Sequence, residues 1–209
     1  GYGVDSPLLS LAQIRFHDKD IRAWVLVDEE AARREAETMT AEAAEGRLRG
    51  PFHGIPLGIK DIIDVAGLPT EAGSPLRKGR IAPQDAPVVA SLRRAGAILL
   101  GKTVTVEFAC FDPPPTRNPW NLQRSPGGSS SGSAAALAAQ MCLGALGTQT
   151  GGSLVRPSSY CGIATCKPTF GRVDRTGVVP VSHHFDHVGP MARRVRDLAI
   201  LLQCLPPSS

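Results

Sequence analysis

The sequence contains few aromatic residues and no long apolar run. Aromatic side chains make up 5% of 209 residues, and 23 Lys and Arg are scattered along the chain beside 19 Asp and Glu. Nucleic-acid-binding surfaces combine clustered basic residues with aromatic stacking platforms, so no nucleic-acid partner is expected. No stretch reaches the roughly 18–20 apolar residues that a membrane-spanning helix requires, so no membrane partner is expected either.

The cysteines also exclude one class of site. The five of them contain no CxxC pair: Cys110, Cys142, Cys161, Cys166 and Cys204. A structural zinc site is therefore not expected, and an odd number of cysteines without a visible signal peptide is typical of reduced thiols. We expect a cytoplasmic protein with no bound metal, although a targeting segment removed upstream would leave no trace in this sequence.

The composition that is present is typical of a globular protein with many loops. Hydrophobic residues make up 42% of the chain and charged residues 20%, and 22 glycines and 18 prolines occur without a repeat. The length is enough to bury one sizeable core, so we expect residues 1–209 to form a single domain.

Capping residues and apolar spacing predict helices and strands in alternation. Asp28 and Gly46 bound an expected exposed helix over 28–46, and Asp85 and Gly96 bound another over 86–95. The run 54–63 is apolar, but its Pro and Gly indicate an irregular or edge strand. Further strands are expected at 97–100, 143–147 and 162–166, and further helices at 131–141 and 195–205. The alternation predicts an α/β fold with helices on both faces of the sheet.

Two segments rich in glycine and serine are the most informative part of the sequence. They are Ser125-Pro-Gly-Gly-Ser-Ser-Ser-Gly-Ser133, which leads into a predicted helix, and Gly147-Thr-Gln-Thr-Gly-Gly-Ser153, which follows a predicted strand. Such residues let consecutive backbone N–H groups converge on one oxygen, as an oxyanion hole requires. Flexible linkers have similar compositions, but both segments join regular elements directly, which disfavours that interpretation.

A serine nucleophile needs a base, and none of the five histidines lies in either segment. Lysine can serve only if burial disfavours its charged form, because its ordinary pKa is about 10.4. Lys60 lies among Ile55, Leu57, Ile59, Ile62 and Ile63, which would provide that burial. Its neighbour Asp61 would point to the opposite face of an extended strand.

Several motifs in this order resemble the amidase signature family. They are Gly54-Ile-Pro-Leu-Gly-Ile-Lys60-Asp, Ser125-Pro-Gly-Gly-Ser129-Ser-Ser-Gly, Gly147-Thr-Gln-Thr-Gly-Gly-Ser153, Cys161-Gly, Lys167-Pro-Thr and Asp186-His-Val-Gly-Pro190. The resemblance implies the amidase signature fold, with a mixed β-sheet, and an amidase that hydrolyses a carboxamide through an acyl-enzyme without a cofactor. Family catalytic domains are considerably longer, so the domain is expected to be cut short at its C-terminal side, with 1–50 as an N-terminal helical segment and 51–209 as the catalytic core.

The same resemblance implies a role for each site residue. Lys60 is the base, Ser129 relays the proton and follows a cis peptide bond, and Ser153 is the nucleophile. The oxyanion-hole amides would come from Thr150, Gly151, Gly152 and Ser153.

The resemblance is incomplete around Ser153. Many family members carry an acidic residue where this chain has Gln149, and an arginine where it has Val155, while Arg156 follows one position later. This variant resembles the branch that acts on small amides more than the subunit that amidates charged tRNA. We interpret Arg156 as a ligand for a substrate carboxylate, with a structural ion pair or a carbonyl contact as the equal alternative.

Two other functions compete with the amidase. The segment 128–132 also matches the G-x-S-x-G motif of α/β-hydrolase esterases with Ser130 as nucleophile, followed downstream by Asp186 and His187, but the preceding segment 118–126 reads as a loop where that motif needs a strand. Alternatively, the shortened chain is an inactive or binding-only fragment, whose exposed sheet edge favours a homo-oligomer or association with a missing C-terminal half. The expected ligand is otherwise a small-molecule amide.

Overall fold

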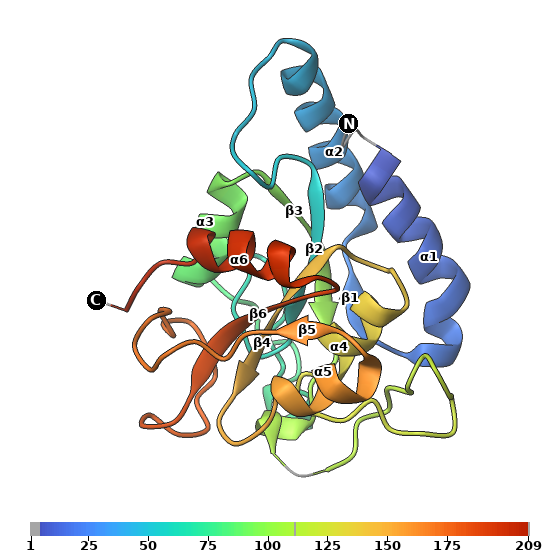
Figure 1. The fold of residues 1–209 in the computed structure, drawn as a ribbon, viewed down its shortest axis with the longest axis vertical. Helices are drawn as coiled ribbons and strands as arrows, with labels where there is room; N and C mark the ends of the chain where they lie inside the picture. Colours follow the sequence, from blue (N-terminus) through green and yellow to red (C-terminus); the bar gives the residue numbers. More distant parts are fainter. Residues whose placement is uncertain (1–4, 111, 209) are drawn as a thin grey trace.

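The computed structural model describes residues 5–110 and 112–208, and in it a six-stranded mixed sheet carries helices on both faces (Figure 1). The strand order is β1-β3-β2-β4-β6-β5. The strands are β1 (Trp24–Val27), β2 (Ile55–Lys60), β3 (Ala97–Thr103), β4 (Gly144–Gln149), β5 (Ala164–Thr165) and β6 (His187–Ala192). The helices are α1 (Asp5–Ile21), α2 (Glu29–Ala44), α3 (Pro87–Arg94), α4 (Ser131–Ala138), α5 (Val155–Cys161) and α6 (Val195–Cys204), with short 3₁₀ turns at Pro75–Arg77 and Glu107–Ala109.

The middle of the sheet is parallel and its flanks are antiparallel. Strand β2 runs parallel to β3 and to β4, whereas β1 and β6 pair antiparallel with β3 and β4. The carboxyl ends of β2 and β4 therefore meet at the same edge of the sheet. Loops that follow parallel strands at this edge are the usual place for a ligand site in α/β folds.

Alternating residues of the central strands supply two separate cores. In β3, Ile98 and Leu100 belong to the core under α1, α2, α4 and α5, while Ala97 and Leu99 belong to the core under α3 and α6. This is the two-residue period of a strand that is buried on both sides. The predicted α/β fold with helices on both faces is confirmed.

The position of β2 corrects the prediction of an edge strand. It lies between β3 and β4, at the centre of the sheet, although the predicted irregularity is present as a register shift between Leu57 and Gly58. Pro56 is tolerated because it is the second residue of the strand, and the pairing of β2 with β4 begins only at Leu57. Proline at the start of a strand removes no donor from the fully paired part of the ladder.

The predicted N-terminal cap is correct for α2 and wrong for α3. Asp28 caps α2, since its carboxylate accepts from Ala31 N at 3.2 Å. The predicted cap of α3 by Asp85 is wrong, because Ala86 occupies that position without a side-chain hydrogen bond. The Asp85 carboxylate accepts instead from Ala66 N and from Arg93 Nε, at 2.7 and 3.1 Å.

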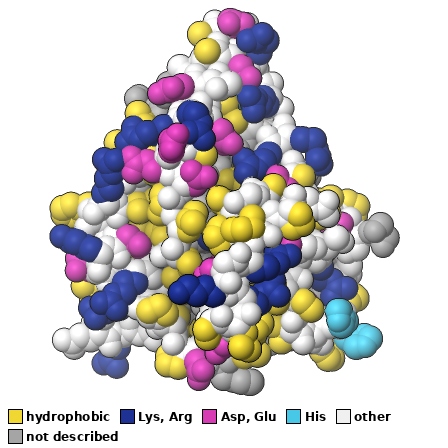
Figure 2. All heavy atoms as spheres, turned by 180° about the vertical axis from the view of Figure 1, so that it is seen from behind, with side chains coloured by type: hydrophobic (Ala, Val, Ile, Leu, Met, Phe, Trp, Pro, Cys, Tyr) yellow, Lys and Arg dark blue, Asp and Glu magenta, His cyan; other side chains and the backbone are white. Residues whose placement is uncertain are grey.

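The surface carries charges of both signs. On the face seen in Figure 2, basic and acidic side chains are interspersed, with apolar groups between them, as the scattered charges of the sequence predicted. In the described part of the chain, no helix is long and apolar enough to cross a membrane.

Candidate active site

Lys60 is the last residue of β2 and is completely buried. Its Nζ lies 2.7 Å from Ser129 Oγ and 2.7 Å from Thr148 Oγ1, and both contacts are to neutral hydroxyls. Among the described residues, Lys60 forms no ion pair. Burial lowers the pKa of Lys60 well below its ordinary value, and the negative charge of Asp186 opposes this shift only partly. The site therefore favours a neutral amine in contact with a serine hydroxyl.

Ser129 lies in the loop before α4, and the peptide bond between Gly128 and Ser129 is cis, as the family resemblance implied. The Ser129 side chain is buried, and its hydroxyl is the one that contacts Lys60. The Gly128 carbonyl accepts a hydrogen bond from Arg156 Nε at 3.0 Å. This contact links the first residue of the cis bond to helix α5.

Ser130 is held in a structural role. Its buried hydroxyl donates to Thr148 O at 3.1 Å and accepts from Thr148 N at 3.2 Å, so it bridges the α4 loop to β4. The residues of the competing esterase triad do not meet, since Asp186 contacts Thr150 and His187 contacts Lys167 and the Phe185 carbonyl. The described geometry therefore does not assemble that triad.

Ser153 closes the second loop, between β4 and α5, and is mostly buried with 8% of its surface exposed. The two serine loops are joined directly, because Ser130 N donates to Ser153 O at 3.2 Å. Gln149 fixes the far end of this loop, since its side-chain oxygen accepts from Leu154 N and Val155 N at 2.9 and 3.1 Å. Gln149 thus supplies the acceptor for the first amides of α5.

The amides that precede α5 are free to bind an oxygen. Within the described residues, the backbone N–H groups of Gly151, Gly152 and Ser153 have no hydrogen-bond acceptor. A side chain at Gly151 would meet no atom within 4 Å, so open space lies beside the loop. Free donors next to open space are one requirement of an oxyanion hole. Neither Gly151 nor Gly152 adopts the left-handed conformation, so the turn itself does not require glycine. The missing side chains instead let another molecule approach the backbone closely.

Arg156 lies on α5 and is exposed. Its Nε contacts the Gly128 carbonyl, while its other two nitrogens have no partner among the described residues. It lines a cavity of about 250 Å³ together with Ser125, Gly127, Gly128 and Tyr160. A carbonyl contact, one of the alternatives for this residue, is therefore present beside the Ser129 loop.

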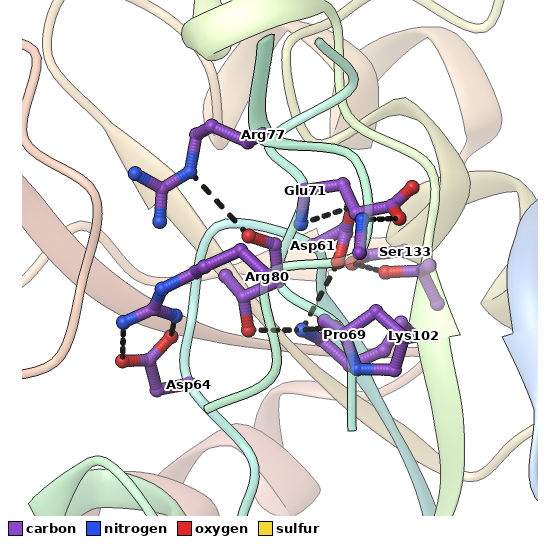
Figure 3. A network of polar contacts seen from close by, with 11 residues as sticks. Asp61, Asp64, Pro69, Glu71, Arg77, Arg80, Lys102 and Ser133 are labelled. Carbon is purple, nitrogen blue, oxygen red and sulfur yellow. Dashed lines mark hydrogen bonds and ion pairs between the residues drawn. The ribbon is translucent and has the colours of Figure 1, made fainter. Parts of the chain in front are cut away.

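Asp61, the residue after β2, forms a buried ion pair with Lys102 of β3 that was not predicted from the sequence (Figure 3). Lys102 Nζ lies 3.0 Å from an oxygen of Asp61, and it also donates to Pro69 O and Thr70 Oγ1 at 2.8 and 2.9 Å. The other oxygen of Asp61 accepts from Glu71 N at 3.3 Å. Asp61 is thus paired with Lys102 and not with Lys60, in agreement with the prediction that it points away.

The histidine-rich segment 183–187 does not assemble a metal site. In residues 5–110 and 112–208, no three His, Cys, Asp or Glu side chains lie close enough together to hold a metal ion. Sequence reasoning did not assign Thr148, and it assigned Asp186 only to the competing esterase triad. Both stand in motifs quoted above, but their contacts depend on how β4 pairs with its neighbours.

Known proteins resemble this chain over most of its length. A model of the amidase family matches residues 8–207. A glutamyl-tRNA(Gln) amidotransferase subunit from Roseiflexus sp. (strain RS-1) is 46% identical over 201 residues, which cover 93% of this chain and 41% of that protein. The chain thus spans about two fifths of this relative's length.

Solved structures give the same result. The native peptide amidase of Stenotrophomonas maltophilia superposes with a TM-score of 0.93 at 40% identity, over 99% of this chain and 45% of the peptide amidase. A chain from a vestigial protein complex, described in connection with the origins of an s-triazine catabolic enzyme, gives a TM-score of 0.95 at 38% identity. That match covers 100% of this chain and 47% of the other.

Proposed function

This chain belongs to the amidase family, and from that premise we propose that it carries the catalytic residues of an enzyme that hydrolyses a carboxamide to a carboxylic acid and ammonia or an amine. Ser153 is the nucleophile, Ser129 the proton relay and Lys60 the base. Thr150, Gly151, Gly152 and Ser153 supply the oxyanion-hole amides. The reaction is proposed to need no metal and no organic cofactor.

One observation carries the proposal: a lysine with no counter-ion in contact is buried at hydrogen-bond distance from a serine hydroxyl. Burying a charged ammonium without a partner is costly, so burial favours the neutral form of the Lys60 amine. A neutral amine has a lone pair that can accept the proton of Ser129. The contact between Ser130 N and Ser153 O keeps the nucleophile's loop beside this relay.

Acylation begins when Ser153 Oγ attacks the amide carbonyl carbon. The Ser153 proton passes to Ser129 Oγ, and the Ser129 proton passes to Lys60 Nζ. Negative charge develops on the carbonyl oxygen, and the free amides of Gly151, Gly152 and Ser153 can stabilise it. Lys60 then returns its proton through Ser129 to the departing nitrogen, the C–N bond breaks, and an acyl group remains on Ser153.

Deacylation repeats the relay with water as the nucleophile. Water attacks the acyl carbon and loses a proton through Ser129 to Lys60. The tetrahedral adduct collapses, Ser153 leaves as its hydroxyl after regaining a proton through the same relay, and the carboxylic acid departs. Each group has then returned to its starting protonation state.

We further propose that Arg156 selects substrates with a carboxylate on the acyl side. Two of its nitrogens have no partner among the described residues, and Arg156 lines a cavity that also touches Gly128, one residue from the relay serine. A planar guanidinium recognises a carboxylate through two parallel hydrogen bonds. In steady-state assays, Arg156→Ala is expected to lose the preference for half-amides of dicarboxylic acids over neutral amides, while thermal unfolding shows an intact fold. An unchanged preference in the folded variant would leave Arg156 with only its carbonyl contact.

We propose that the chain associates with another copy of itself or with a C-terminal half through the open edge of its sheet. Strand β5 has two residues and lies at the edge of the sheet, where further strands can pair. Related proteins are named as subunits or as parts of a complex.

The test is intact-mass labelling with a fluorophosphonate, which phosphonylates an activated serine with loss of fluoride. Wild type is expected to gain one adduct, located at Ser153 by peptide mapping. The adduct should be absent from Ser153→Ala and slow to form in Ser129→Ala and Lys60→Ala. Ser130→Ala is the matched control, since it removes an adjacent serine, and should still be labelled at Ser153.

Two outcomes would contradict the proposal. An adduct on Ser130 would favour the esterase, and a folded wild-type chain that gains no adduct would be an inactive or binding-only member of the family. Adding a C-terminal half from a relative would then show whether the lack of that half is the reason that Ser153 does not react.

A further inference from the structure

Asp186 faces the proposed oxyanion loop across the sheet. The antiparallel pairing of β4 with β6 places Thr148 opposite Val188 and Gln149 opposite His187. The next pair beyond the ladder is Thr150 and Asp186, and their side chains meet, with the Thr150 hydroxyl donating to one carboxylate oxygen of Asp186. Directly opposed residues on an antiparallel pair are close enough for such a contact.

The second carboxylate oxygen of Asp186 holds its own loop. It accepts from Val181 N at 2.8 Å and from Ser182 N at 2.9 Å. The Asp186 main chain is fixed as well, since its N–H donates to Ser182 O and its carbonyl accepts from Arg175. Asp186 is therefore anchored to a loop that is itself tightly hydrogen-bonded, and it projects one oxygen towards Thr150.

Thr150 is the residue through which this anchor reaches the catalytic loop. The loop is fixed elsewhere at its far end, by the Gln149 contacts to Leu154 N and Val155 N and by the Ser130 contact to Ser153 O. The near end of the loop is held by the hydrogen bond from the Thr150 hydroxyl to the Asp186 carboxylate. Threonine is stiff at χ1, so holding its hydroxyl also restrains its backbone.

We propose that Asp186 is a positioning residue for the amide hydrolysis proposed above: through Thr150 it fixes the amides of Gly151, Gly152 and Ser153 in the orientation that receives the oxyanion. This inference rests on the proposed function. A cavity of about 440 Å³ touches Asp186, Thr150 and also Thr148, the second partner of Lys60. Asp186 and Thr150 thus line the same open space, beside the loop that would bind the transition state.

The charge of Asp186 has a second, separable effect. It raises the pKa of Lys60, against the larger lowering by burial. An asparagine would remove this charge but keep the shape: its oxygen can accept from the two backbone amides while its NH₂ group donates to Thr150. Asp186→Asn therefore separates position from charge, and Asp186→Ala removes both.

The experiment compares the variants Asp186→Ala, Asp186→Asn and Thr150→Val in the full chain by two measurements. The first is the fluorophosphonate labelling rate of Ser153, corrected for the folded fraction. The second is hydrogen exchange of the peptide containing Thr150–Ser153. Asp186→Ala and Thr150→Val should each slow labelling about 10-fold or more and speed exchange of this peptide. Their double variant should be no slower than the worse single one, because both remove the same contact, and Asp186→Asn should restore the rate to within about threefold of wild type.

The inference is overturned if Asp186→Ala lowers the melting temperature but leaves labelling and exchange unchanged, since Asp186 would then only support the 181–186 loop. It is also overturned if the two single losses multiply in the double variant. Failure of the proposed function looks different, because wild type itself would gain no adduct. In that case the exchange data still decide whether Asp186 orders the Thr150–Ser153 loop.

Discussion

Two buried lysines on neighbouring strands illustrate how surroundings decide the chemistry of one residue type. Lys102 has a carboxylate, a carbonyl and a hydroxyl around its Nζ, which is a full set of partners for an ammonium. Lys60 has only two hydroxyls and is completely buried. The pKa of Lys102 is also lowered by burial, but Asp61 opposes that shift at contact distance. We therefore interpret Lys102 as a structural cation and Lys60 as a base.

The Thr148 hydroxyl is the second hydrogen-bond partner of the Lys60 amine, and its removal tests the environment of that amine. Thr148→Val removes one of the two hydroxyls that orient the Lys60 amine, with little change in volume. A hydrogen bond of this kind is worth about 1 kcal/mol, so the labelling rate of Ser153 is expected to fall about fivefold. Thr116→Val is the control, because the buried Thr116 hydroxyl donates to the Arg22 carbonyl outside the proposed relay. Equal rate losses in both variants would show that the Thr148 contact has no specific role.

The sequence predicted only part of the site at the level of residues. Lys60 could be identified because its apolar neighbours in the chain predict burial, and the serine loops because their composition is unusual. The contacts of Thr148 with Lys60, of Asp186 with Thr150 and of Lys102 with Asp61 could not be predicted, because each joins segments that are far apart in the sequence. A single sequence specifies such contacts only once the strand register is known.

At the scale of elements, helix α4 approaches the neighbouring backbone so closely that only glycine fits at one position. A Cβ on Gly132 would lie 2.2 Å from Ala23 O and 2.3 Å from Val104 N. The Gly132 N–H also donates to the Val104 carbonyl at 3.0 Å. This contact sets the distance between β3 and the helix that begins just after Ser129.

Gly132→Ala is therefore expected to destabilise the fold by about 1–3 kcal/mol, because the backbone atoms it meets cannot move aside freely. Urea denaturation would measure the change. Gly151→Ala is the matched control for stability, since a Cβ there meets nothing within 4 Å and the backbone is not left-handed. It should lie within about 0.5 kcal/mol of wild type. A Gly132→Ala variant as stable as this control would contradict the packing described for α4.

The errors in predicting elements have physical causes. The Pro and Gly of β2 predicted an irregular or edge strand. The strand is irregular but central, and Pro56 is compatible with that position because it precedes the part of the ladder shared with β4. Strands β1 and β6 and helices α1 and α5 were not predicted. Strand β1 has four residues and β6 contains both Gly189 and Pro190, so neither gives a clear two-residue pattern. The ten-residue amphipathic helix α6, with regular apolar spacing, was predicted to within one residue.

At the scale of the whole molecule, we propose that residues 1–209 form one domain in which segment 1–50 is not separable. Strand β1 lies in that segment and pairs with β3, and Trp24 belongs to the same core as Ile98 and Met141. The Trp24 indole also donates to the Met141 sulfur at 3.2 Å. The N-terminal segment therefore contributes a strand to the sheet and helices to one of the layers that pack on it.

One domain should unfold in one transition. In a Trp120→Phe variant, the fluorescence of buried Trp24 reports on the N-terminal segment, while far-ultraviolet circular dichroism reports on all helices. The two denaturation curves are expected to coincide. Loss of the Trp24 signal at lower denaturant than the dichroism would show that segment 1–50 is a separate unit.

The proposed mechanism requires Lys60 to be neutral when Ser153 reacts, and the pKa of Lys60 can be measured directly. In the chain labelled with ¹³C at lysine ε-carbons, Lys60→Met identifies the resonance of Lys60, which is then followed against pH. Burial lowers the folded-state pKa, so Lys60 should stay neutral well below pH 10.5, and the labelling rate of Ser153 should fall as pH drops through that same midpoint. A Lys60 that titrates like an ordinary lysine, or a labelling rate that does not follow its titration, would contradict the proposed mechanism.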